Sequence, residues 1–142
     1  MLLPAFIALV TACAQPYDSA RFKRDFAHGV AAYDKGEYAE AAAYWQPLAA
    51  RFDLAAMRNM GHLHRQGLGV DRDLKKALAY FEAAARRGLA AAQYDAAMLY
   101  LSNDTIAYNA QKALGWLAQA AKSGYPPAQA QIKRMQMKSK PF

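Results

Sequence analysis

Apolar residues recur every three or four positions along most of the chain, which is the spacing of one face of an α-helix. The clearest stretch covers residues 74–85, and similar side chains return at the same positions in residues 110–121. Each stretch follows a side chain suited to N-capping and precedes a glycine that can adopt a positive φ. These boundary residues are Asp73 and Gly88 for one stretch and Asn109 and Gly124 for the other. The pattern predicts an all-α chain built from short helices.

The chain also repeats itself with a period of 36 residues. The superposed sets are Ala41, Ala77 and Ala113; Tyr44, Tyr80 and Trp116; Trp45, Phe81 and Leu117; Gly88 and Gly124; and Gln93 and Gln129. Each unit reads as two helices, and such units become stable only by stacking on their neighbours. We therefore expect an αα-hairpin repeat solenoid in residues 21–142, with units at about 22–53, 54–89 and 90–125.

An array of this kind needs a polar end, because its last helix has no further unit to cover it. Residues 126–138 open with two prolines, which suit the first turn of a helix. The segment then carries mostly polar and basic side chains around a narrow apolar edge, formed by Ala128, Ile132 and Met135. We predict that it is a C-terminal capping helix.

The N-terminal residues predict a secretory signal. Residues 1–10 form an apolar stretch of the length found in signal peptides. Two small residues follow the stretch, and the chain's one cysteine, Cys13, comes directly after them. The run from Val10 to Cys13 resembles the lipobox of bacterial lipoproteins, which implies cleavage before the cysteine and attachment of diacylglycerol to its sulfur. We expect a signal peptide in residues 1–12 and a lipidated tether in residues 13–20. The alternative is a buried N-terminal helix with an inert thiol.

The same resemblance implies a location. In the lipoprotein class, an aspartate directly after the lipidated cysteine retains the protein at the inner membrane, whereas this chain has Ala14 there. That residue favours the periplasmic side of the outer membrane. Basic residues near both ends are expected to add contact with anionic lipid. They are Arg21, Lys23 and Arg24 near the tether and Lys133, Arg134, Lys138 and Lys140 near the C terminus.

The length, the net charge and the distribution of basic residues limit the kinds of partner that the chain is expected to bind. The chain has 142 residues and a formal net charge of +7, which favours anionic partners or simply keeps the protein soluble. Its length allows one domain or a short array. The basic residues are scattered over both helices of each unit rather than interleaved with aromatic side chains along one track, so nucleic acid is not an expected partner. No stretch reaches the roughly 20 apolar residues of a membrane span.

The second unit carries a recognisable motif, Gly-x-Gly-Val-x-x-Asp-x-x-Lys-Ala, which runs from Gly67 to Ala77. Gly61 precedes it, and Ala-Ala-x-x-Gly follows in residues 84–88. This motif resembles the Sel-one-like repeat, which belongs to the tetratricopeptide superfamily of helical solenoids. The first unit resembles a plain tetratricopeptide repeat, through Gly29, Tyr33, Gly36, Tyr38, Ala41 and Trp45. The resemblance implies a helical solenoid that binds another protein.

Residue types that carry catalysis or bind metals are sparse. The histidines are His28, His62 and His64, and positions 62 and 64 point about 200° apart on a helix, so they do not share a metal. His64 aligns with Tyr100 one period later and is expected to fill an aromatic packing slot, with a ligand or base role as the alternative. We expect no metal, no cofactor and no catalytic residue.

The acidic side chains and the single thiol likewise indicate no catalytic or metal-binding site. Asp73 is explained by N-capping, and Glu37 and Glu40 suit the dipole of a helix start. A single cysteine excludes an internal disulfide framework and a thiolate zinc cluster. Some cysteine-rich relatives of the Sel-one-like family act on β-lactams, but they carry a disulfide in each repeat. This chain lacks those cysteines, so the resemblance does not extend to that activity.

With no catalytic or metal-binding residues expected, the candidate functional feature is a protein-binding surface. In the tetratricopeptide pattern, the first helix of each unit lines the concave face of the solenoid. Its exposed positions here place apolar and aromatic side chains around central arginines, which favours an extended peptide or helix with an acidic centre. The predicted protein-binding residues are Phe26, Val30, Tyr33, Arg58, His62, Arg65, Tyr94, Met98 and Leu101, with Lys23 beside them. The alternative is ordinary helix packing with solvated charges.

These interpretations predict a non-enzymatic, lipid-anchored adaptor or assembly factor of the bacterial cell envelope, whose partners are envelope proteins. They also predict that Arg58→Glu combined with Arg65→Glu abolishes partner capture and leaves the fold intact. One alternative function is a small peptidoglycan- or β-lactam-processing enzyme, which would need a nucleophile within hydrogen-bond reach of a base. A second alternative is an unlipidated cytosolic scaffold.

Overall fold

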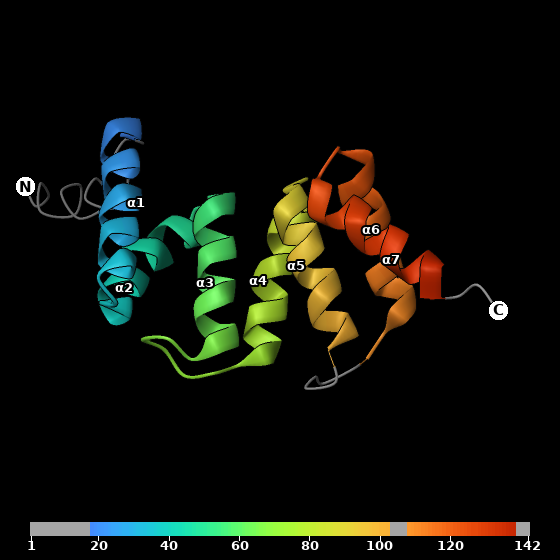
Figure 1. The fold of residues 1–142 in the computed structure, drawn as a ribbon. Helices are drawn as coiled ribbons and strands as arrows, with labels where there is room; N and C mark the ends of the chain where they lie inside the picture. Colours follow the sequence, from blue (N-terminus) through green and yellow to red (C-terminus); the bar gives the residue numbers. More distant parts are fainter. Residues whose placement is uncertain (1–17, 103–107, 139–142) are drawn as a thin grey trace, which may run out of the picture.

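The computed structural model describes residues 18–102 and 108–138, and all regular secondary structure within these ranges is helical. The helices are α1 (Ser19–Asp34), α2 (Tyr38–Ala50), α3 (Leu54–Gln66), α4 (Leu74–Arg86), α5 (Ala90–Leu101), α6 (Ala110–Lys122) and α7 (Pro126–Lys138) (Figure 1). The expectation of an all-α chain is confirmed. Cys13 and the predicted signal peptide in residues 1–12 lie outside the described residues.

Each helix packs mainly against the helices that precede and follow it in the chain. Figure 1 shows the resulting hairpins standing side by side along one direction, with α1 and α7 at opposite ends of the array. The pairs α1–α2, α3–α4 and α5–α6 correspond to the three units expected from the 36-residue period. The αα-hairpin solenoid is thereby confirmed. The first helix begins at Ser19 with Asp18 as its N-cap, so residues 19 and 20, expected in the tether, belong to α1.

The helix boundaries have the chemistry that the sequence indicated. The carboxylate of Asp73 accepts from the backbone N–H of Lys76 at 2.9 Å, and the side chain of Asn109 accepts from that of Lys112 at 2.9 Å. Gly88 and Gly124 follow α4 and α6 with φ values of 92° and 81°. These local signals therefore set the start and the end of both second helices.

Two glycines of the second unit make close packing possible. A Cβ atom on Gly61 would lie 2.5 Å from the ring of Phe81, which is fully buried. Gly69 has a φ of 67°, and a Cβ there would collide with the backbone of Ala39. The loop between α3 and α4 thus rests directly on the start of α2, which joins the first unit to the second.

Helix α7 ends the array with a polar surface. Ala128 is buried, and Ile132 and Met135 pack against the cluster that contains Leu117. One period earlier, Ala97 and Tyr100 of α5 belong to that cluster and face α6. Their counterparts in α7 are Lys133 and Gln136. The side of α7 on which a second helix would pack is therefore polar, as expected of a capping helix.

Candidate functional site on the first-helix face

The first helices α1, α3 and α5 share one face of the solenoid, which we call the first-helix face. At its N-terminal end, α1, α2 and α3 surround an open cavity of about 250 Å³. The residues that line it are Val30, Tyr33, Trp45, Asn59 and His62. Three of them, Val30, Tyr33 and His62, are among the predicted protein-binding residues, so the fold does bring part of that set together.

Aromatic packing holds the wall of the cavity in place. The ring of Trp45 lies 5.8 Å from that of Tyr33, and Tyr33 meets Tyr38 edge-on at 5.2 Å. The indole Nε1–H of Trp45 donates to the backbone carbonyl of Phe26 at 3.3 Å. Gly29 allows this approach, because a Cβ there would overlap the indole ring. The two aromatic side chains of the wall, Trp45 and Tyr33, are thus held in place by their neighbours.

On the other side of the cavity, a buried carboxylate ties α3 to α5. The side chain of Asp95 is 7% exposed, and its Oδ2 accepts from Nε of Arg58 at 2.5 Å. The same oxygen lies 3.1 Å from Nε2 of His62. The ring of His62 also meets Phe81 edge-on at 5.0 Å. This cluster fixes the position of the imidazole at the cavity wall.

The electrostatics of this cluster favour the ionised carboxylate. Burial by itself raises the pKa of Asp95, but hydrogen bonds from His62 and Arg58 outweigh burial and hold the pKa below the ordinary value of 3.8. A buried charge persists only with partners of this kind. Asp95 is therefore a structural anion that holds two residues of the neighbouring unit.

Asp95 corrects the role expected for Arg58. Arg58 was predicted to be a protein-binding residue on the exposed side of its helix, and its guanidinium is paired with a buried carboxylate. The predicted double variant Arg58→Glu with Arg65→Glu would set two carboxylates against each other beside α5, so we no longer expect it to leave the fold intact. The sequence did contain a signal, since Asp95 is the one charged residue in the mostly apolar segment 90–101.

The other predicted residues are divided between a second cavity and the core. Arg65 and Met98 contribute to a cavity of about 140 Å³ between the second and third units. Phe26 packs against Trp45 with ring centroids 6.2 Å apart, and Tyr94 packs against Tyr125 at 5.8 Å. Leu101 packs against the buried cluster around Leu117. For these last three residues, the stripe seen in the sequence is largely a packing stripe.

His64 has the packing role that the repeat predicted. It is buried, and its ring stacks on Tyr80 with centroids 5.8 Å apart and an interplanar angle of 13°. Its Nδ1 lies 3.2 Å from the carbonyl oxygen of Asp71. The imidazole thus joins α3 to α4 and to the loop between them, and it does not share a site with His62.

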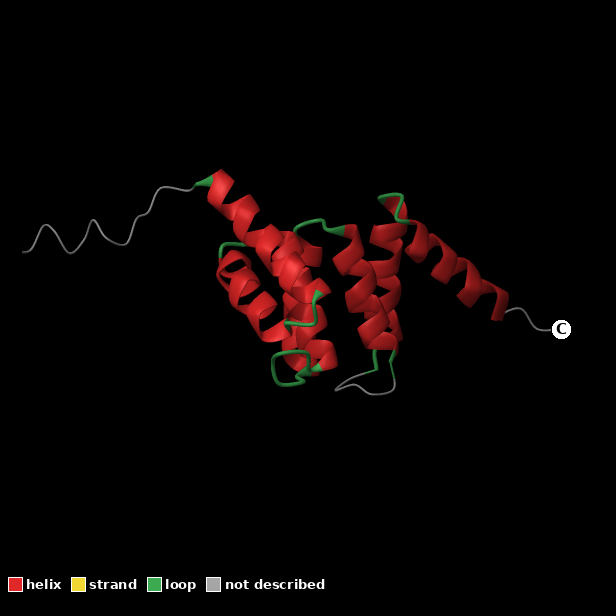
Figure 2. Cartoon of the chain, turned by 60° about the vertical axis from the view of Figure 1, so that its left-hand side comes forward, coloured by secondary structure: helices red, strands yellow, loops and turns green. Residues whose placement is uncertain are grey.

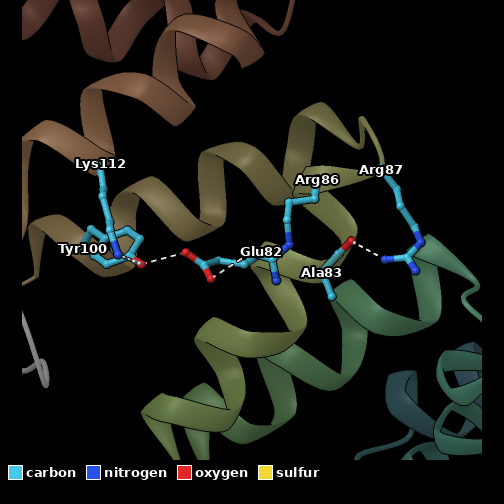
Figure 3. Close-up of polar contacts among 6 residues, drawn as sticks. All are labelled: Glu82, Ala83, Arg86, Arg87, Tyr100 and Lys112. Carbon is cyan, nitrogen blue, oxygen red and sulfur yellow. Dashed lines mark hydrogen bonds and ion pairs between the residues drawn. The ribbon is translucent and has the colours of Figure 1, made fainter.

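A second polar cluster links the second and third units on the other side of α5 (Figure 3). The hydroxyl of Tyr100 donates to Oε1 of Glu82 at 2.6 Å, and Arg86 pairs with the other carboxylate oxygen at 3.2 Å. Nζ of Lys112 lies 3.4 Å from the same hydroxyl. Burial and the neighbouring Glu82 raise the pKa of Tyr100 to about 12. A phenol that holds its proton so firmly is a brace between helices rather than a base.

The arrangement around the cavity can orient an imidazole but lacks the rest of a nucleophilic site. An Asp–His pair supplies two members of a catalytic triad, which also needs a hydroxyl or thiol within reach of the imidazole. The five residues that line the cavity include no serine, threonine or cysteine, and their one hydroxyl is the phenol of Tyr33. Among the described residues, no three histidine, cysteine or carboxylate side chains are placed to hold a metal ion. Within the same ranges, no helix has the length and apolar character that a membrane span requires.

Comparison with known proteins identifies the repeat. Two structures of similar fold are a Sel1 repeat protein from Oxalobacter formigenes and c5321, a protective antigen present in uropathogenic Escherichia coli strains displaying an SLR fold. They share 25% and 24% sequence identity with this chain, each with a TM-score of 0.73 over 80% of it. The chain spans only 46% and 25% of their respective lengths.

Comparison with protein-family models agrees with the 36-residue period of the chain. No curated protein gives a significant match to this chain. The Sel1 repeat model, in contrast, matches residues 54–89 and 90–125, which are the boundaries expected for the second and third units. On these grounds the chain belongs to the Sel1 repeat family.

Proposed function

We propose that this protein is a non-enzymatic adaptor that binds a peptide segment of another protein on its first-helix face. Sel1 repeats are in general scaffolds for interaction between proteins. The observation that carries the proposal is the cavity of about 250 Å³ between α1, α2 and α3. Sites for drug-sized ligands begin at roughly 300 Å³, so a cavity of this size suits a single apolar side chain of a partner. Its rigid aromatic wall is typical of the pockets that receive such anchors.

The charges of α3 indicate which residue of the partner lies next to the apolar side chain that enters the cavity. Helix α3 contains no aspartate or glutamate, and Asp95 is already committed to Arg58 and His62. Arg65, two turns further along α3 from Arg58, lines the next cavity together with Met98. An acidic residue of the partner would meet Arg65 when the anchor occupies the first cavity. The expected ligand is therefore a segment with one aromatic or large aliphatic residue and an acidic residue on one side of it.

A library of random peptides displayed on phage tests this proposal. Selection on the full chain should enrich peptides that pair an apolar anchor with an acidic residue. Asn59→Trp fills the cavity and should abolish the enrichment, whereas the matched control Ala79→Trp, at an exposed position of α4, should retain it. Arg65→Glu should select against the acidic residue and keep the anchor.

Two outcomes would contradict the proposal. One is enrichment that is equal for Asn59→Trp and Ala79→Trp, which would place binding elsewhere. The other is that selection on the parent chain enriches no peptide at all, although the parent and both variants are folded and share the same thermal midpoint and helical circular dichroism.

The cellular setting is part of the same proposal. The lipobox-like run from Val10 to Cys13 supports a lipid anchor at the periplasmic side of the outer membrane, with partners among the proteins of the bacterial cell envelope. Growing cells with a clickable fatty acid tests the anchor. Label should enter the parent protein and be missing from Cys13→Ala, and label retained in the variant would reject lipidation.

A further inference from the structure

Consecutive helices are antiparallel, so the starts of the first helices and the ends of the second helices lie along one edge of the solenoid. This edge holds the start of α1 and the loops α2–α3, α4–α5 and α6–α7, and it is uppermost in Figures 1 and 2. We call it the upper edge. Its segments are residues 18–25, 51–53, 86–89 and 122–125. The opposite edge holds the loops α1–α2 and α3–α4 and the end of α5.

The upper edge presents a row of exposed basic side chains that follows the repeat. Arg51 and Arg87 occupy equivalent positions after α2 and α4, and Arg86 and Lys122 are equivalent at the ends of α4 and α6. The start of α1 adds three more exposed basic residues, which are Arg21, Lys23 and Arg24. Positive charge thus extends along the whole edge.

The acidic side chains on or near this edge are already engaged. Asp18 and Asp53 cap the starts of α1 and α3. Asp25 pairs with Arg21 at 3.6 Å, and Glu82 binds Arg86 and Tyr100. Seven basic residues therefore stand against four acidic ones, and the edge keeps a net positive charge.

Phe52 departs from the repeat on the same edge. Its counterparts one and two periods later are Gly88 and Gly124, and all three residues have a positive φ, which is 64° for Phe52. An L side chain is strained in that conformation, and the other units show that the turn needs only glycine. Phe52 is 59% exposed, and the guanidinium carbon of Arg87 lies 4.3 Å from the centroid of its ring. An exposed aromatic residue held at a strained position indicates a role in contact rather than in folding.

We propose that the upper edge docks on an anionic phospholipid bilayer, with the arginines and lysine at the phosphates and Phe52 at the boundary of headgroups and acyl chains. Aromatic rings flanked by basic residues are suited to that boundary. The path of the chain favours a bilayer over a protein partner, an inference that rests on the proposed lipid anchor. Cys13 is five residues before Asp18, a span of at most about 18 Å, so its lipid would hold this edge close to the headgroups.

Vesicle binding without the lipid separates this proposal from the anchor. Full-length Cys13→Ala protein is sedimented with vesicles of phosphatidylcholine alone, or of phosphatidylcholine and phosphatidylglycerol in equal amounts. We expect binding to the anionic vesicles only, falling as salt is added. Neutralising three upper-edge charges, by Arg51→Gln, Arg87→Gln and Lys122→Gln, should weaken partitioning on the order of a hundredfold.

Two controls make the result specific to the edge. Lys35→Gln, Lys75→Gln and Lys76→Gln remove the same number of exposed charges from the opposite edge and should leave partitioning near the parent value. Phe52→Gly installs the residue that the other units use, so it should weaken partitioning without lowering the thermal midpoint. Equal losses from both triple variants, or no binding to anionic vesicles, would overturn the proposal. Unchanged partitioning of Phe52→Gly would overturn the insertion of the ring.

Orientation can be read directly with an environment-sensitive dye. In the Cys13→Ala background, a dye attached through Ser123→Cys reports on the upper edge, and one attached through Lys35→Cys reports on the opposite edge. We expect a blue shift on anionic vesicles for the first dye and none for the second. A shift of the second dye alone would overturn the proposal, whatever the outcome of the peptide selection or of the fatty-acid labelling.

Discussion

Two clusters join the second unit to the third, and they differ in what surrounds them. One holds Arg58 and His62 of α3 to Asp95 of α5, beside the open cavity. The other holds Tyr100 of α5 between Glu82 of α4 and Lys112 of α6. The shortest contacts are similar, at 2.5 Å and 2.6 Å. The clusters therefore serve the same mechanical purpose, while only the first contributes a side chain to the cavity wall.

The charge states also differ. Asp95 is ionised, because its two basic neighbours lower its pKa despite burial. Tyr100 is neutral, because burial and Glu82 raise its pKa to about 12. Removing a partner from a buried ion pair leaves an uncompensated charge, whereas removing the neutral Tyr100 hydroxyl leaves Glu82 still paired with Arg86 and costs less. Charged residues in a repeat protein thus indicate a binding site only where they adjoin open surface.

The largest expected effect comes from reversing one charge of the first cluster. Arg58→Glu places a carboxylate against the buried Asp95 and should lower the free energy of unfolding by about 3 kcal/mol, measured by urea denaturation. Arg65→Glu is the matched control, because it reverses an arginine of the same helix that pairs with no buried carboxylate among residues 18–102 and 108–138. It should change stability by less than about 0.5 kcal/mol. Equal effects of the two variants would remove the distinction between the arginines.

A smaller loss is expected from the second cluster. Tyr100→Phe removes the hydroxyl that joins Glu82 to Lys112 and should cost about 1 kcal/mol in the same assay. Tyr108→Phe, at a residue that is 65% exposed, is the control and should be neutral. Peptide selection on Tyr100→Phe should match the parent chain. If Tyr100→Phe keeps the stability of the parent chain and no longer enriches peptides, the binding site lies at this cluster and not at the cavity.

The acid limb of the stability curve reports on Asp95. Its pKa is lower in the folded state than the ordinary value of 3.8, so its stabilising effect is present above that value and is lost as the pH falls through the folded-state pKa. Asp95→Asn should be less stable than the parent near neutral pH and should show a shallower decline below about pH 4. Parallel acid limbs would show that the carboxylate is not held in its charged form.

The alkaline limb reports on Tyr100 and should change least. Its folded-state pKa of about 12 lies above the ordinary value of 10.0, so its contribution is complete below about pH 10 and disappears as the pH rises toward 12. Tyr100→Phe should therefore flatten the decline in stability across that range. Tyrosinate absorbance of the folded chain provides an independent measure, since Tyr100→Phe should remove a component that ionises near pH 12.

Local signals in the sequence were sufficient for the fold. The period, the caps at Asp73 and Asn109, and the glycines after α4 and α6 each act within a few residues, and the helices have those bounds. The capping helix was equally readable, because the narrow edge of Ala128, Ile132 and Met135 is a one-dimensional pattern.

The site was only partly readable, because it depends on contacts between units. Val30, Tyr33 and His62 were identified from their helical positions and do surround one cavity. Asp95 was missed, since its partner Arg58 lies 37 residues earlier and no local pattern joins them. Phe26, Tyr94 and Leu101 repeat with the spacing of an exposed stripe, but packing between neighbouring helices half-buries them. Periodicity gives the face of a helix, and only the superhelix decides how much of that face stays open.

The polar outer side of α7 has a consequence for engineering. A helix added after α7 would meet Lys133 and Gln136 where α6 meets Ala97 and Tyr100, so a simple fusion of another repeat would fail to stack. Restoring Ala and Tyr at those two positions should turn the terminus into an acceptor for consensus repeats. The length of the solenoid would then be adjustable in steps of one hairpin, with the cavity at the far end left as it is.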